Sequence, residues 1–111
     1  MASSSIKLPI TQDVLYSGDK WASGAKTIEW EKYDFIVFQC RTNTEYPAFY
    51  YDTKLGNGPF ETCLTAYDPA AGWLNTRITF TFATNTITPT LHYNNANWTL
   101  GCIKIIGVKI N

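Results

Sequence analysis

The chain has 111 residues, enough for one domain of ordinary size. Nine basic residues balance nine acidic ones, and neither sign gathers in a run, which argues against an electrostatic grip on nucleic acid or an anionic membrane. No stretch reaches membrane-spanning length, and "MASSSIKLP" lacks the apolar core of a signal peptide. We therefore expect a leader or linker at 1–9 and a single domain at 10–111, with no cofactor, nucleic-acid partner or membrane insertion.

Alternation of apolar and polar residues predicts strands throughout the chain. The connections between them carry Gly, Pro, Asn and Asp, and no stretch shows a helical period with caps. Short strands at this spacing are typical of an all-β fold, and we expect an antiparallel β-sandwich, jelly-roll-like, with about eight strands. The expected strands are 10–16, 26–30, 34–41, 46–51, 61–66, 76–83, 86–93 and 98–110.

Four of these strands carry further information. The segment 34–41 is apolar on both faces, which predicts a central strand. Within 76–83, one face carries Ile78, Phe80 and Phe82, and the other carries Arg77, Thr79 and Thr81. Pro89 cannot donate to a ladder, so its strand should lie at an edge or carry a bulge. The last strand changes phase near Gly107, and a bulge at that glycine would return its apolar residues to one face.

The cysteines Cys40, Cys63 and Cys102 are odd in number and widely spaced. Their spacing fits no metal site, and a disulfide framework would favour an even count. Each cysteine lies in a strand-like run. We expect three small buried thiols in a reducing compartment.

Strands that run alternately up and down place their connections at the two ends of a sandwich in turn. Every second connection then lies at the same end. One end of the sandwich therefore holds the connections 17–25, 42–45, 67–75 and 94–97, and the other end holds both chain termini. The first end is rich in aromatic and amide side chains, and loops on a rigid scaffold commonly bind ligands. The candidate ligand-binding residues are Trp21, Tyr46, Tyr67, Asp68, Trp73, Asn94, Asn95, Asn97 and Trp98.

These side chains suit a neutral polyhydroxylated ligand. Aromatic rings offer apolar faces to the C–H side of a sugar, and Asn and Asp supply hydrogen bonds that fix its orientation. Aromatic residues at the end of a sandwich also commonly close the core. Trp73 and Trp98 each border a strand directly, so among the candidates these two are the ones we most expect to be buried.

Catalytic chemistry finds little support in the sequence. His92 is the only histidine, so the chain cannot form a histidine-rich metal site. Any Ser-His-Asp catalytic triad would have to use His92. We interpret His92 as a solvated or hydrogen-bonded residue on the threonine face of its strand. Glu29 and Glu31 flank one position as a glycosidase pair might, but Lys26 and Lys32 lie nearby and favour a solvated face. We expect no enzyme, no catalytic residue and no bound metal.

Motifs at the two ends of the chain are similar to those of a known family. The segments "LYSG" at 15–18 and "YDFIV" at 33–37 stand near the start, and "IKIIGVK" at 103–109 stands at the end. Together they resemble the C-terminal receptor-binding domains of phage and prophage tail-fibre and minor tail proteins. Residues 41–98 carry none of this resemblance.

The resemblance implies a receptor-binding head at the tip of a virion fibre, normally a homotrimer, which recognises a host-surface glycan or protein. Such a head would be made in the host cytoplasm without a signal peptide, and an upstream fibre shaft would join at its N-terminus. Two alternatives stay open. One is a structural trimeric cap that binds nothing and buries the aromatic residues between protomers. The other is a free-standing, monomeric carbohydrate-binding module or lectin.

Overall fold

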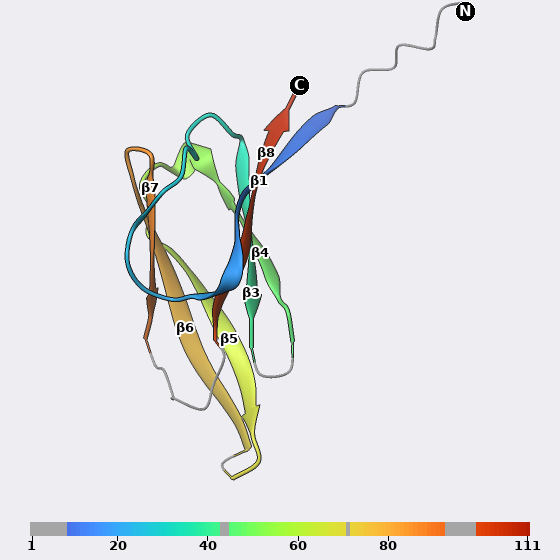
Figure 1. Cartoon of the computed structure of the whole chain (residues 1–111), viewed down its shortest axis with the longest axis vertical. Helices are drawn as coiled ribbons and strands as arrows, with labels where there is room; N and C mark the ends of the chain where they lie inside the picture. Colours follow the sequence, from blue (N-terminus) through green and yellow to red (C-terminus); the bar gives the residue numbers. More distant parts are fainter. Residues whose placement is uncertain (1–8, 43–44, 71, 93–99) are drawn as a thin grey trace, which may run out of the picture.

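The computed structural model describes residues 9–42, 45–70, 72–92 and 100–111. These residues form two antiparallel four-stranded sheets that face each other, so the predicted β-sandwich is confirmed (Figure 1). A short 3-10 helix, η1 (Thr53–Leu55), follows the fourth strand. The strands are β1 (Ile10–Trp21), β2 (Lys26–Thr27), β3 (Phe35–Arg41), β4 (Ala48–Asp52), β5 (Phe60–Asp68), β6 (Gly72–Ala83), β7 (Thr86–Leu91) and β8 (Gly101–Ile110).

The strand order is β1-β8-β3-β4 in the first sheet and β2-β7-β6-β5 in the second. β1 pairs with β8 and β2 with β7, the nested pairing of early with late strands that gives a jelly roll its form. The inner neighbours are simple hairpins, β3–β4 and β5–β6–β7. The fold is therefore jelly-roll-like in the pairs β1–β8 and β2–β7, whereas β5, β6 and β7 form a meander.

No helix among the described residues is long and apolar enough to cross a membrane.

The strand patterns explain these positions. β3 lies between β8 and β4, as its two apolar faces predicted. β2 is shorter than expected and pairs with β7 only at Thr86 and Ile87, so β7 forms the edge of the sheet around Pro89. Ile28 and Trp30 leave the expected strand because both side chains enter the core, where the Trp30 indole N–H donates to the Ala83 carbonyl at 2.8 Å.

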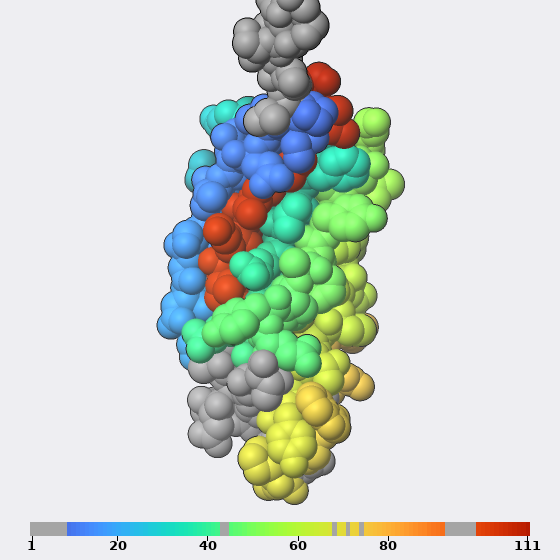
Figure 2. All heavy atoms as spheres, turned by 90° about the vertical axis from the view of Figure 1, so that its right-hand side faces the viewer, coloured from blue at the N-terminus to red at the C-terminus, as the bar shows by residue number. Residues whose placement is uncertain are grey.

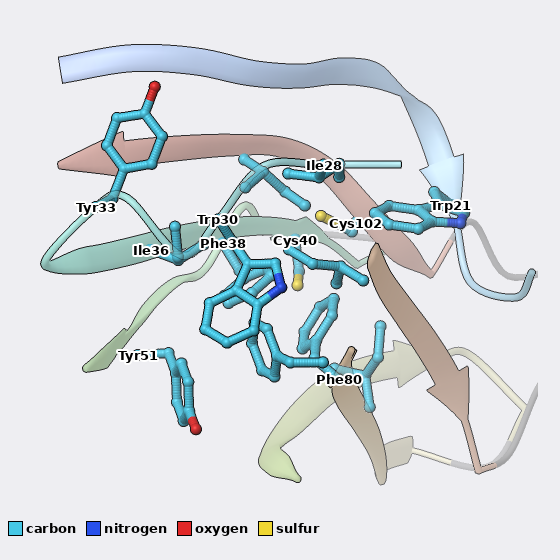
Figure 3. Close-up of a cluster of buried hydrophobic side chains, with 14 of the residues drawn as sticks. Trp21, Ile28, Trp30, Tyr33, Ile36, Phe38, Cys40, Tyr51, Phe80 and Cys102 are labelled. Carbon is cyan, nitrogen blue, oxygen red and sulfur yellow. The ribbon is translucent and has the colours of Figure 1, made fainter. Parts of the chain in front are cut away.

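The core is an aromatic stack between the two sheets (Figure 3). Phe38 of β3 stacks on Phe80 of β6 with ring centroids 4.0 Å apart, and Tyr51 of β4 stacks on Phe82 of β6 at 4.5 Å. All four side chains are buried. Alternation along β6 accounts for this, because Ile78, Phe80 and Phe82 share the buried face and Arg77, Thr79 and Thr81 share the other.

Gly107 does not form the predicted bulge. The pairing of β8 with β1 and with β3 is regular at Gly107, and the register shifts fall at Leu15 and Ile103 instead. Gly107 faces the interior, where the ring of Tyr33 lies directly over it, and a Cβ there would come within 2.7 Å of the ring. The Tyr33 hydroxyl donates to the Asp13 carboxylate at 2.8 Å. Burial, reinforced by Asp13, raises the pKa of Tyr33 to about 12. The glycine thus makes room for an aromatic ring that closes this end of the sandwich.

We predict that Gly107→Ala destabilises the protein by about 1–3 kcal/mol, the usual cost of overpacking a filled interior. The buried Tyr33 ring is held by its hydroxyl and cannot retreat cheaply. Denaturant unfolding measures the change. On a Tyr33→Leu background the same substitution should cost much less. An equal cost in both backgrounds would show that the ring is not what excludes a side chain at position 107.

Candidate functional site

The β5–β6 hairpin reaches the end of the sandwich opposite the start of β1 and the end of β8 (Figure 1). Ile10 and Ile110 are paired at the other end. Gly72 closes the hairpin with a φ of +84°, a conformation that glycine adopts readily. Asp68 pairs with Gly72 as the last rung of the ladder. The tip of the hairpin therefore lies at the end of the sandwich away from the start of β1.

An aromatic pair stands at the end of this hairpin. Tyr67 and Trp73 are direct partners across β5 and β6, with ring centroids 5.2 Å apart in an edge-to-face arrangement. Their side chains point outward because Leu64 and Ala66 of β5 point into the core. Trp73 is 62% exposed and Tyr67 is 40% exposed. The pair presents apolar ring surface to solvent.

Polar side chains continue the same outer face away from the aromatic pair. Thr65 lies opposite Asn75, and its hydroxyl donates to the Asn75 amide oxygen at 2.9 Å. The next row holds Cys63 opposite Arg77, with His92 on the far side of Arg77, where the His92 backbone N–H donates to the Arg77 carbonyl. We call this surface the hairpin face; it consists of Cys63, Thr65, Tyr67, Trp73, Asn75, Arg77 and His92.

The hairpin face contains an open hollow of about 410 Å³, which Cys63, Asn75, Thr76, Arg77 and His92 line. Two contacts orient its polar groups. Arg77 pairs with Glu61 across the strands, with 2.9 Å between Nη1 and Oε1. His92 Nε2 lies 2.6 Å from the Thr79 hydroxyl. A guanidinium, an imidazole and an amide thus border one concave surface beside exposed aromatic rings.

The structure separates the predicted candidates. Tyr67 and Trp73 come together on the hairpin face, so the expectation that Trp73 is buried is wrong. Tyr46 is exposed but precedes β4 in the other sheet. Trp21 is only 6% exposed, and its indole N–H donates to the Gly24 carbonyl at 2.8 Å (Figure 3). Trp21 is therefore a core residue and does not belong in the candidate site.

Asn94, Asn95, Asn97 and Trp98 lie outside the described residues. Asp68 is described through its backbone pairing with Gly72.

The cysteines also differ from the expectation of three buried thiols. Cys40 and Cys102 are buried cross-strand partners, and a hydrogen bond between them together with burial raises the pKa of the Cys40 thiol. Cys63 is exposed, because it alternates with the buried Leu64 and so faces outward. The sequence already contained this signal, since alternation along 61–66 must place Cys63 and Leu64 on opposite faces.

The alternating up-and-down order of strands predicts only which connections lie at one end of the sandwich. It therefore does not predict the hairpin face, which consists largely of strand residues. The sequence places Arg77 and His92 on the polar faces of their strands, but it does not show that these two faces adjoin. That fact depends on the pairing of β6 with β7 and on its register. Among the described residues, no group of three or more His, Cys, Asp or Glu side chains is arranged to hold a metal ion.

Neither a comparison with protein-family models nor a search of curated proteins finds a match to this chain. Inference about its function therefore rests on the hairpin face and on the sequence motifs.

We predict opposite stability effects for the two tryptophans. Trp73→Ala should change the free energy of unfolding by no more than about 0.5 kcal/mol, as is usual at the surface. Trp21→Ala should cost about 3–5 kcal/mol, because it empties a filled part of the core. Denaturant unfolding followed by circular dichroism measures both changes. A cost of several kcal/mol for Trp73→Ala would mean that the Trp73 ring is structural.

Proposed function

We propose that this chain is a non-enzymatic receptor-binding head of a phage fibre, which holds a host-surface saccharide on the hairpin face. One observation carries the proposal: a solvent-exposed Tyr–Trp pair stands on the hairpin that projects farthest from the start of β1. An upstream shaft that joined at β1 would leave this hairpin facing outward from the particle. The resemblance of the terminal motifs to phage tail-fibre domains supports the same function.

The chemistry of the hairpin face suits a saccharide. Tyr67 and Trp73 offer ring surface for the apolar side of a pyranose. Asn75 and Thr65 can donate to and accept from sugar hydroxyls beside them. The surface is open, so we expect weak binding at one site. Several copies on one particle would then raise the overall affinity through avidity.

A second surface supports assembly of several copies. The outer side of the first sheet has an apolar face, which Figure 2 shows with β1, β8, β3 and β4 side by side. Val14, Ile106, Val37 and Tyr50 form one row across the four strands. We call this surface the apolar sheet face; its apolar side chains are Ile10, Val14, Phe35, Val37, Tyr50, Ile106, Val108 and Ile110.

We propose that further copies of this chain cover the apolar sheet face in a homotrimer. Four strands about 4.8 Å apart and five residues along each give a face of about 20 by 17 Å, which is the size of the largest apolar patch on a typical monomer, a patch that is often functional. The same outer side also carries Gln12 and Asp52, in the row of Val108 and Phe35, and Lys104 in a neighbouring row, so its charges are few and of both signs. The two apolar faces of β3 are typical of a strand covered on both sides. The second sheet covers only one of them.

The saccharide-binding proposal predicts a selective loss of adhesion. Labelled protein should bind cells in a panel of Gram-negative and Gram-positive bacteria, and Trp73→Ala should reduce that binding at least tenfold because it removes the stacking surface. Leu55→Ala is the matched control, since Leu55 is 72% exposed on η1, far from the hairpin. Unchanged adhesion of Trp73→Ala would exclude the hairpin face. Failure to bind any cell or any glycan on a bacterial glycan array would favour a structural cap.

The assembly proposal predicts a trimer in solution, measured by light scattering on a sizing column. Val14→Lys should shift the mass toward that of a monomer, because Val14 is 59% exposed within the apolar sheet face and a buried charge there would be unpaired. Thr90→Lys is the control, since Thr90 is exposed on the outer side of the other sheet. A monomeric parent protein would contradict the trimer and favour a free-standing lectin.

A further inference from the structure

The hollow on the hairpin face has a chemical character of its own. Its lining differs from the aromatic pair in carrying a guanidinium, Arg77, and an imidazole, His92. Both groups sit on the exposed side of their strands, so a ligand can reach them from solvent. A neutral sugar needs neither group, because amide and hydroxyl side chains already satisfy its hydroxyls. The lining therefore points to a ligand that also carries negative charge.

Arg77 is oriented for such a ligand. Its Nη1 contacts Glu61 on the neighbouring strand at 2.9 Å, which holds the guanidinium across the face of the sheet. Arginine has five N–H donors in a planar fork, so this one contact leaves other donors for a second acceptor. A carboxylate or a sulfate can accept two of them side by side. Glu61 does not line the hollow, although its carboxylate partly offsets the charge of Arg77 beside it.

The distance between the hollow and the aromatic pair sets the size of the ligand. Cys63 and Arg77 lie four residues along their strands from Tyr67 and Trp73, on the same outer face. At about 3.4 Å per residue, the separation along the hairpin is about 14 Å. This span exceeds a single pyranose ring. The ligand that uses both ends must be an oligosaccharide.

From this arrangement we infer that the hairpin face binds an acidic oligosaccharide, with a sugar ring against Tyr67 and Trp73 and a carboxylate or sulfate on Arg77. The inference rests on the proposed saccharide-binding function and names the class of ligand that this site selects. Thr65 and Asn75 occupy the row between the two ends and would contact the connecting sugar.

Three oligosaccharides test the inference by calorimetry at low salt. Trigalacturonate carries carboxylates, a κ-carrageenan tetrasaccharide carries sulfates, and galactotriose is neutral. We expect at least one acidic probe to bind ten times more tightly than galactotriose, and added salt to weaken its binding. Whichever acidic probe binds identifies carboxylate or sulfate as the preferred group. Equal binding of the neutral probe, or no binding of either acidic one, would overturn the inference.

Two variants test whether Arg77 is the residue that binds the negative charge of the acidic probe. Arg77→Gln should weaken the acidic probe about tenfold, as expected for a charge-assisted hydrogen bond, and leave galactotriose unchanged. Lys109→Gln removes an exposed cation near the end of β8 and should change nothing. An acidic probe that binds Arg77→Gln as tightly as the parent protein would refute the role of Arg77. In that case the proposed saccharide-binding function would still stand if Trp73→Ala reduced cell adhesion, because that function does not depend on Arg77.

Cys63 provides a direct readout at the hollow. It is the exposed cysteine of the three and one of the residues that line the hollow. The bound acidic probe should slow alkylation of Cys63 by iodoacetamide, an uncharged reagent, and the effect should disappear in Arg77→Gln. Alkylation of Cys63 at the same rate with saturating probe would place the ligand elsewhere on the surface.

Discussion

The stack of Phe38 on Phe80 is the interaction on which the rest of the structure depends. It joins a central strand of one sheet to a central strand of the other, and no other ring pair in the core has closer centroids among the described residues. Tyr51 and Phe82 extend the contact along the same direction. Because these rings lock the two sheets in one relative position, the outward side chains of β6 are also held in place. The geometry of the hairpin face is therefore a consequence of core packing.

Strand alternation could be predicted from the sequence, and with it most of the fold. The pattern around Phe80 correctly divided β6 into a buried and a polar face, and the two apolar faces of β3 correctly placed it inside its sheet. The edge position of β7 around Pro89 followed from the chemistry of proline. These predictions succeeded because alternation and proline chemistry are local properties of the chain.

Predictions that needed two distant segments failed. Trp21 and Trp73 both follow turn-rich stretches, yet one is buried and the other exposed, because only the folded sandwich determines which ring finds space in the core. Gly107 broke the apolar alternation, and its reason lies in Tyr33, far away in sequence. The juxtaposition of Arg77 with His92 likewise depends on register between strands. Tyr67 and Trp73 were thus among the candidates predicted from the sequence, although Trp73 was expected to be buried, and the polar half of the candidate site was not predicted.

The hairpin also has a consequence for how a binding specificity can change. Along β5 and β6, residues such as Leu64 and Ile78 support the core, whereas their neighbours in sequence face solvent. Substitutions at the outward positions would change the proposed binding surface without removing core contacts. Mutations at these positions can therefore change ligand binding with little effect on folding. Selection on recognition and selection on stability would then act on separate sets of residues. For the receptor-binding head that we propose, this separation would let recognition follow changes in the host.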